Sequence, residues 1–241
     1  MNRLRIGNCG FRISDWGLRI CMLAVVALLG AGAASAGTLT AQEIIKRAAD
    51  EYDRVQDYMV DAKVTVSSPN IHVPQMNVKI YYKKPDKLHV ESRDGFAALP
   101  KQGVMIGNPL RDMLKDSELS LAGSEKALGR DCHLIKVTYR NQGQVTRARV
   151  WIDKERWVAV QTYVDPDSGP SIRLSLWYSK VSGKYWMPSK SQAVIEFPTI
   201  TGGRRATESK PAKPSTITVQ FSNYKINTGL SDRIFRKKRS N

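Results

Sequence analysis

Residues that could bind a metal ion are scarce in this sequence. It contains only three Cys and three His among 241 residues. His72, His89 and His133 lie in separate segments, and neither Cys-x-x-Cys nor His-Glu-x-x-His occurs. Those are the spacings that bring several ligands to one metal ion. The sequence therefore predicts no metal site and no cofactor.

Motifs that support catalysis are also missing. There is no Gly-x-Ser-x-Gly nucleophile turn, and Gly202-Gly203 is not followed by a predicted helix that could bind phosphate. Cys132 and His133 are adjacent in a predicted strand, where successive side chains point to opposite faces. They therefore cannot act together as nucleophile and base. No spacing suggests a carboxylate pair, so we predict no catalytic residues and a protein that is not an enzyme.

Only one long apolar run is present, and it is near the N-terminus. The run from Ile20 to Gly32 follows a segment with four Arg residues and precedes Ala34-Ser35-Ala36. This pattern is typical of a secretory signal peptide, here cleaved after Ala36. The alternative is a membrane anchor, which needs about 20 apolar residues where this run has about 13. No Cys follows the run to carry a lipid, so we predict export to the periplasm.

Cysteine becomes scarcer still after such a cleavage. Removal of residues 1–36 takes Cys9 and Cys21 away and leaves Cys132 alone in residues 37–241. An intramolecular disulfide is then excluded, so stability must come from packing. No repeat or domain boundary divides residues 37–241, which we expect to form one domain and a monomer.

Acidic residues are few relative to basic ones. The chain has 38 Lys and Arg against 22 Asp and Glu, a net charge of +16. Residues 1–36 carry four Arg and one Asp, so a net charge of +13 remains after cleavage. A positive charge of this size favours anionic partners. Export argues against nucleic acid and favours an anionic membrane surface. The alternative is a solvated basic surface without a partner.

Two amphipathic helices are predicted. Thr40-Ala41-Gln42-Glu43 has the form of a capping box, and an apolar stripe continues behind it for about four turns. A short helix is expected over residues 109–116, after Asn108-Pro109. Both helices could cover the mouth of a curled sheet as a lid. The apolar residues expected in this lid are Ile44, Ile45, Ala48, Tyr52, Val55, Leu110, Met113 and Leu114.

The remaining segments mostly alternate with period two, which indicates a mainly β fold class with few helices. We expect about eleven strands, near residues 59–67, 76–82, 88–90, 96–106, 118–124, 132–139, 146–152, 157–164, 172–176, 185–197 and 216–224. Short connections favour pairing of neighbouring strands in order. A single antiparallel sheet of this length must curl or close. Residues 198–215 lack any apolar period and are expected to be a flexible basic loop, and residues 236–241 a basic tail.

A curled sheet with this many strands encloses more volume than its side chains easily fill. That volume and the two helices favour an apolar cavity over the alternative, a solid core. The alternation places a set of apolar side chains inward, where they are expected to line the cavity and bind a ligand. They are Val78, Ile80, Val90, Val150, Ile152, Val158, Val160, Leu174, Leu176, Ile195, Val219 and Phe221.

Four stretches that follow the leading helix resemble the LolA/LolB-like periplasmic carriers, the outer-membrane lipoprotein-sorting proteins. They are "VKIYYKKPDKLHVES" (78–92), "GSEKALGRDCHLIKVTY" (123–139), "VWIDKERWVAVQTYV" (150–164) and "FSNYKINTGLSDRIF" (221–235). The resemblance implies an unclosed β-barrel of eleven strands lidded by helices. It also implies that acyl chains bind in an apolar cavity without any chemical reaction.

The resemblance further implies roles for single residues. In the carriers, the residue before the Pro of the "KKPDK" turn is commonly an Arg that holds the lid helix. Here it is Lys84, which is therefore counted with the lid. The C-terminal strand would complete the half-open barrel, and Leu230, Ile234 and Phe235 would form an apolar clip after it.

These observations together predict a non-enzymatic periplasmic carrier or chaperone that moves an acylated lipoprotein or lipid towards the outer membrane. Inner- and outer-membrane transport proteins would be its other partners. A first alternative is an RseB-like regulatory lipid-binding module that acts on an envelope-stress partner, although such regulators usually carry a second domain. A second alternative is an enzyme on this scaffold. It would need titratable groups inside the cavity, where the alternation places almost none.

Overall fold

The computed structural model describes residues 39–69, 72–92, 108–141, 144–198 and 213–236. The chain divides into two compact units, residues 1–38 and 39–241, and every described residue lies in the second. Several expectations lie wholly or mainly outside the described residues. They are the signal peptide over 1–36, the strand near 96–106, the loop over 198–215 and the tail over 236–241.

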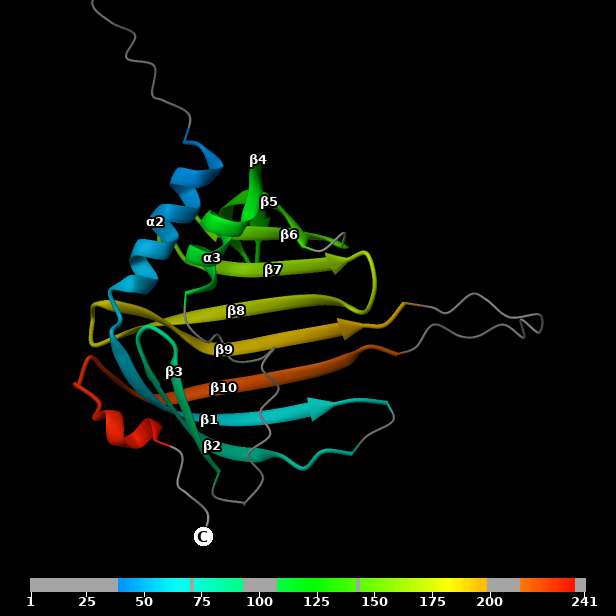
Figure 1. Ribbon diagram of the computed structural model, residues 1–241. Coiled ribbons are helices and arrows are strands. Elements are labelled where there is room, and N and C mark those ends of the chain that lie inside the picture. The colour runs from blue at the N-terminus through cyan, green and yellow to red at the C-terminus, as the bar shows by residue number, and fades with distance from the viewer. Residues whose placement is uncertain (1–38, 70–71, 93–107, 142–143, 199–212, 237–241) are drawn as a thin grey trace, which may run out of the picture. The chain divides into compact units, whose positions relative to one another are not determined.

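Ten antiparallel strands form one sheet in the described part of the chain (Figure 1). They are β1 (Asp57–Ser67), β2 (Met76–Lys83), β3 (Lys87–Ser92), β4 (Ser117–Ala127), β5 (Arg130–Asn141), β6 (Gln144–Asp153), β7 (Ala159–Pro166), β8 (Ser171–Val181), β9 (Tyr185–Glu196) and β10 (Ser215–Ile226). The order across the sheet is β3-β2-β1-β10-β9-β8-β7-β6-β5-β4, so the sheet has two free edges and is not closed. This confirms the fold class, a mainly β protein with one unclosed antiparallel sheet.

Strands pair in chain order with one exception. β3 does not pair with β4, and β1 pairs instead with β10, with Val64 opposite Val219. The expectation of pairing in order is therefore wrong at this connection. The argument from short connections does not apply there, because the long segment 93–116 separates the two strands. As a consequence, the first and last strands meet in the middle of the sheet.

The leading helix, α2 (Ala41–Asp53), begins where the capping box predicts. The Thr40 hydroxyl accepts a hydrogen bond from the Glu43 N–H at 3.2 Å, and the Glu43 carboxylate accepts one from the Thr40 N–H at 2.8 Å. These bonds hold the pKa of Glu43 below its usual value. The short helix α3 (Pro109–Asp116) has Pro109 in its first turn, a position where the missing N–H is not needed.

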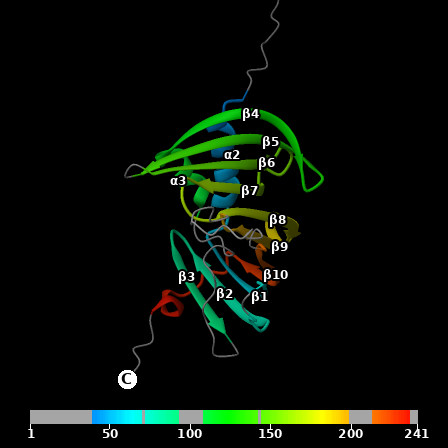
Figure 2. The ribbon, with the colours of Figure 1, turned by 90° about the vertical axis from the view of Figure 1, so that its right-hand side faces the viewer.

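Both helices lie under the curved part of the sheet made by β4 to β7 (Figure 2). Ile44, Ile45 and Ala48 of α2 have no exposed surface, and they pack against Val150 and Ile152 of β6. Leu110 and Met113 of α3 belong to the same apolar cluster, as does Ile135 of β5. We call the face of the sheet that carries Val150 and Ile152 the inner face, and the opposite one the outer face.

The inner face continues across the other half of the sheet. Cross-strand partners point to the same face, and Val64, Val219 and Ala193 belong to one buried cluster with neighbours from β1, β2, β9 and β10. The burial of β1 alternates as the sequence predicts, with Val60, Ala62 and Val64 buried. A second apolar surface therefore lies beside the one that the helices cover.

Candidate functional site

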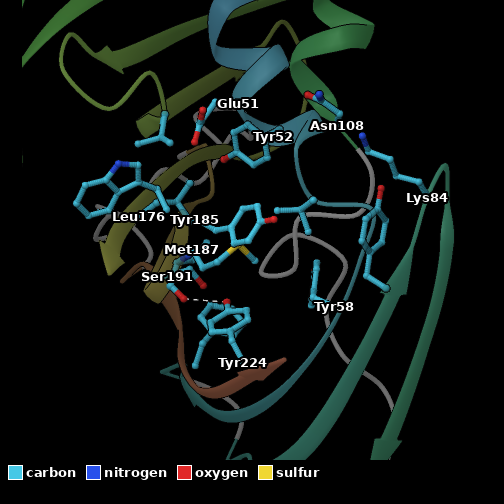
Figure 3. Close-up of a pocket in the computed structure, with 16 residues that line it drawn as sticks. Glu51, Tyr52, Tyr58, Lys84, Asn108, Leu176, Tyr185, Met187, Ser191 and Tyr224 are labelled. Atoms are coloured by element: carbon cyan, nitrogen blue, oxygen red, sulfur yellow. Dashed lines mark hydrogen bonds between the residues drawn. The ribbon is translucent and has the colours of Figure 1, made fainter. Parts of the chain in front are cut away.

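A cavity of about 70 Å³ lies where the C-terminal end of α2 meets the inner face of the sheet (Figure 3). Aromatic and aliphatic side chains make up most of its wall, and a few polar groups lie among them. The lining residues are Glu51, Tyr52, Val55, Tyr58, Tyr82, Lys84, Asn108, Val158, Leu176, Tyr185, Trp186, Met187, Pro188, Ser191, Phe221 and Tyr224. They come from α2, from the link to β1, from the α3 N-terminus, and from strands β1, β2, β8, β9 and β10. Lys84 lies in the turn after β2, and Val158 in the link between β6 and β7.

Aromatic rings from three strands form one wall. Tyr58 and Tyr82 have ring centroids 5.2 Å apart, Tyr58 and Tyr224 6.0 Å, and Phe221 and Tyr224 6.3 Å. The Tyr224 hydroxyl donates to the Pro188 carbonyl at 2.8 Å, which leaves its ring as apolar wall. Burial raises the pKa of Tyr58 and of Tyr224, so both phenols stay neutral at physiological pH.

A pair of phenols ties the end of α2 to the sheet. The Tyr52 and Tyr178 oxygens are 2.7 Å apart, and the Tyr178 hydroxyl donates to the Ala159 carbonyl at 2.9 Å. Either phenol can donate in this pair, since each hydroxyl has one proton and can also accept. Burial raises the pKa of Tyr52 to about 12, although the bond to Tyr178 acts in the opposite direction. The tether is therefore a neutral hydrogen bond.

Cations from other elements hold the last turn of α2, which has no basic residue of its own. Lys84 Nζ donates to the Asp53 carbonyl at 2.6 Å and lies 2.8 Å from Asp53 Oδ1. Arg111 Nε donates to Asp53 Oδ2 at 2.8 Å, and Asn108 Nδ2 donates to the Ala49 carbonyl at 2.8 Å. Burial alone would raise the pKa of Asp53, but the bonds from Lys84 and Arg111 outweigh it and lower the pKa. These donors satisfy helix-end carbonyls and complement the negative end of the helix dipole.

The C-terminal Asn-Thr-Gly turn fixes the link between α2 and β1. Asn227 Oδ1 accepts from the Gln56 N–H at 2.7 Å. The Asp57 carboxylate, buried at 4% exposure, accepts from the Thr228 N–H at 2.9 Å and from the Gly229 N–H at 3.0 Å. Asn227 and Gly229 have φ values of 54° and 72°, a backbone conformation that favours these two residue types. The turn thus locks the base of the helix that covers the cavity.

The segment after this turn is a short 3-10 helix, η2 (Asp232–Phe235), next to β3. Lys83 and Lys87 donate to the two Asp232 carboxylate oxygens at 2.7 Å and 2.8 Å, which lowers the pKa of Asp232 to about 2. Lys83 also donates to the Leu230 carbonyl at 2.8 Å. Ile234 and Phe235 are half-buried. The role of these apolar residues as a clip stays a prediction.

The structure brings part of the predicted site together. Val158, Leu176 and Phe221 line the cavity, as do Tyr52, Val55 and Lys84 of the expected lid. The other expected lid residues, Ile44, Ile45, Ala48, Leu110, Met113 and Leu114, pack in the cluster under the curved sheet, together with Val150 and Ile152. Val78, Ile80, Val90, Leu174, Ile195 and Val219 lie in the adjoining inner-face cluster. Val160 packs instead with Trp151, next to a register shift between β6 and β7.

Sequence reasoning missed most of the aromatic wall. Tyr82 has the same alternation as Val78 and Ile80, so period two could have found it. Tyr224 breaks the alternation that Phe221 sets, because Asn223 adopts a left-handed backbone with φ of 57° beside a shift in the β1–β10 register. Such a bulge turns a side chain to the other face, and no pattern in the sequence marks it.

The chemistry of this site suits the binding of an apolar group. Within residues 39–236, leaving out the undescribed gaps, no cluster of three His, Cys, Asp or Glu side chains is arranged to hold a metal ion. None of the helices described for this chain combines the length and hydrophobicity of a membrane span. Lys84 Nζ and Asn108 Nδ2 are engaged with the helix end, whereas Asn108 Oδ1 is a buried acceptor that receives no hydrogen bond within the described residues. The expectation of almost no titratable groups in the cavity is wrong, because Glu51, Lys84 and five tyrosines line it.

An unclosed antiparallel sheet with helices against its inner face is the fold of the LolA-like proteins. A DUF1329 family protein from Desulfovibrio piger has 16% identity and a TM-score of 0.54, over 83% of this chain and 98% of that one. A LolA superfamily protein from Nitrosomonas europaea has 12% identity and a TM-score of 0.54, over 83% and 99% of the two chains. A domain from Vibrio parahaemolyticus, assigned to outer membrane lipoprotein sorting, has 14% identity and a TM-score of 0.54, over 80% and 96%.

At these identities the likeness establishes the fold. The sequence itself matches no protein-family model and no curated protein.

Proposed function

We propose that this protein is a non-enzymatic periplasmic carrier that binds the acyl chain of a lipoprotein or lipid beneath α2 and moves it towards the outer membrane. The observation that carries the proposal is the apolar, aromatic-walled cavity under the end of a helix that polar contacts hold in place. The LolA-like fold supports the same function, and the signal-peptide pattern of residues 1–36 supports export.

The size of the cavity means that cargo must widen it. The cavity measures about 70 Å³. Pockets that hold small ligands usually measure about 300–1,000 Å³. The cavity as the structure has it is too small for an acyl chain, so our proposal requires the end of α2 to move away from the sheet when cargo enters.

The contacts that close the cavity are weak enough for cargo to break. The side chains of Lys84 and Asp53 are 24% and 31% exposed, and exposed ion pairs contribute only about 0.2–1 kcal/mol each. Burial of an acyl chain contributes about 0.8 kcal/mol for each CH₂ group, or on the order of 10 kcal/mol for a dozen groups. The N-terminal half of α2 is fixed more firmly, since Ile44, Ile45 and Ala48 are fully buried.

The first test is direct identification of the cargo. The protein is purified from the periplasm, its bound lipids are extracted and identified by mass spectrometry, and the delipidated protein is titrated with a fluorescent fatty acid. We expect co-purified acyl lipid and saturable fatty-acid binding. A protein that carries no lipid and binds no fatty acid would refute the proposal.

A cavity-filling variant supplies the matched control. Leu176 is 3% exposed and faces the cavity, so Leu176→Trp should block fatty-acid binding. Gln220→Trp places the same side chain at an exposed position of β10 and should bind like the wild type. If the two variants bind fatty acid equally well, the acyl chain is bound elsewhere. Co-purification of an envelope-stress partner in place of lipid would favour the RseB-like regulatory alternative.

A further inference from the structure

The outer face of the sheet carries a row of basic side chains across four neighbouring strands. Lys136 of β5 lies opposite Arg149 of β6, Arg149 lies opposite Tyr163 of β7, and Tyr163 lies opposite Arg173 of β8. Val150, the neighbour of Arg149, is buried with α2 on the inner face. Since successive side chains alternate, the row lies on the outer face of the sheet. Figure 2 shows α2 on the other side of the curved sheet.

Aromatic rings lie among these cations. The Arg149 guanidinium is 4.9 Å from the centroid of the Tyr163 ring, and that of Arg173 is 5.6 Å from it. Further along β8, Trp177 lies opposite Lys190 of β9, whose Nζ is 4.5 Å from the indole centroid. We call these residues together the outer-face patch: Lys136, Arg149, Tyr163, Arg173, Trp177 and Lys190.

The positive charge of the patch is not compensated. Among the residues that the structure describes, none of Lys136, Arg149, Arg173 and Lys190 forms an ion pair with a carboxylate. By contrast, Arg147 on the same strand pairs with Asp167 at 2.9 Å. Like charges directly opposite each other, as Lys136 and Arg149 are, destabilise a sheet. The ring of Tyr163 offsets part of this repulsion.

From this arrangement we infer that the outer-face patch docks the protein on an anionic phospholipid bilayer. Basic side chains are attracted to an anionic leaflet, and Trp and Tyr prefer the interface between the headgroups and water. The patch extends over five strands, which lie about 4.8 Å apart, so it matches an extended charged surface. Lys136, Arg149 and Arg173 are exposed. The inference deepens the proposed function and rests on it, because a carrier of acylated cargo must reach membranes.

The test is flotation of the protein with vesicles of phosphatidylcholine, with and without phosphatidylglycerol. The wild type should bind only the vesicles that contain phosphatidylglycerol. The variant K136Q/R149Q/R173Q removes the row of charges. Each Lys or Arg near an anionic surface contributes roughly fivefold to binding, so this variant should bind about 100-fold more weakly.

The matched control, K46Q/R47Q/K115Q, removes the same charge from exposed positions on α2 and α3, the helices that pack against the inner face. It should keep binding within about tenfold of the wild type, since charges beyond a Debye length of ~10 Å from the membrane are screened. An equal loss of vesicle binding in both variants would mean that net charge causes the binding, and would overturn the role of the patch. Membrane docking by the patch would also be overturned if the wild type bound no better to vesicles with phosphatidylglycerol than to those without it. The same holds if the patch bound only an acidic protein.

Fatty-acid binding on the same preparations separates this inference from the proposed function. K136Q/R149Q/R173Q should bind a fluorescent fatty acid as the wild type does, because the cavity lies on the opposite face. Wild-type protein that binds fatty acid but not anionic vesicles would refute membrane docking alone. Wild-type protein that binds the vesicles but not fatty acid would refute the carrier function alone.

Discussion

Asp57 joins the two ends of the described chain, because its buried carboxylate accepts hydrogen bonds from the Asn-Thr-Gly turn. In Asp57→Asn one carboxylate oxygen becomes an amide that faces a backbone N–H donor. We expect the free energy of unfolding to fall by about 2 kcal/mol in urea denaturation. Asp61→Asn is the control, because Asp61 is a half-exposed carboxylate on the same strand. It should change the free energy of unfolding by less than about 0.5 kcal/mol. Equal effects in both would mean that the turn does not hold the link.

Lys84 holds the end of α2 in the closed state. Lys84→Met removes the bonds to Asp53 and should raise the population of the open state. If the closed state loses about 1 kcal/mol, a fluorescent fatty acid should bind about fivefold more tightly, because more protein is competent to bind. Lys83→Met is the control, since Lys83 contacts Asp232 and Leu230 and not α2. Weaker binding by Lys84→Met would show that Lys84 contacts the cargo and does not hold a lid.

The phenol of Tyr52 makes the closed state sensitive to alkaline pH. Its folded-state pKa of about 12 is raised above the ordinary value of 10. The stability that it contributes is therefore fully present below pH 10 and is lost as the pH rises through about 12. We expect the free energy of unfolding of the wild type, measured by urea denaturation, to fall between pH 10 and pH 12. The free energy of unfolding of Tyr52→Phe should fall over the same range by about 1–2 kcal/mol less. Equal pH dependence in the two proteins would contradict the burial of the Tyr52 phenol, which is what raises its pKa.

Single-residue contacts were the hardest feature to predict from sequence. The resemblance predicts Lys84 near the lid, and in the structure its Nζ contacts Asp53 at the end of α2. Arg47 looks like an ordinary exposed residue of α2, yet its guanidinium lies 5.1 Å from the centroid of the Trp157 ring. Arg47→Ala should therefore cost about 0.5–1 kcal/mol, more than its exposure suggests. Such contacts depend on the register of distant strands, which local patterns do not contain.

At the scale of elements, the proposed mechanism requires one half of α2 to stay fixed while its C-terminal end moves. Ile45 is fully buried against the curved sheet, whereas Val55, beyond the helix end, lines the cavity. Ile45→Asp should destabilise the whole domain by at least about 3 kcal/mol in urea, since a carboxylate there has no partner. Val55→Asp should instead weaken fatty-acid binding in a folded protein. Gln42→Asp, on the exposed side of the same helix, is the control and should change neither property.

The helices and nearly all the strands could be read from the sequence, because each has a local signal. The capping box fixed the start of α2, and period two marked the inner side of β1 and β2. The pairing of β1 with β10 could not be predicted from local patterns. It depends on the long connection 93–116, after which β4 lies at the opposite edge of the sheet from β3. The aromatic wall was missed for a related reason, the bulge before Tyr224.

At the scale of the whole molecule, the two faces of one sheet differ in chemistry. The inner face is apolar and is partly covered by α2 and α3, and the outer face carries uncompensated positive charge. The proposed carrier function would use both properties, the apolar face for an acyl chain and the basic face for an anionic membrane. The fold combines them by alternation alone, since Val150 and Arg149 are neighbours on one strand.

Photolabelling tests the central claim most directly. A fatty acid with a diazirine on its chain is bound to the delipidated protein and irradiated, and the labelled residues are identified by mass spectrometry. The claim that the acyl chain lies beneath the end of α2 predicts labels on Tyr58, Met187 and Phe221, and their loss in Leu176→Trp. Labels confined to the outer face, or unchanged labelling in Leu176→Trp, would contradict it.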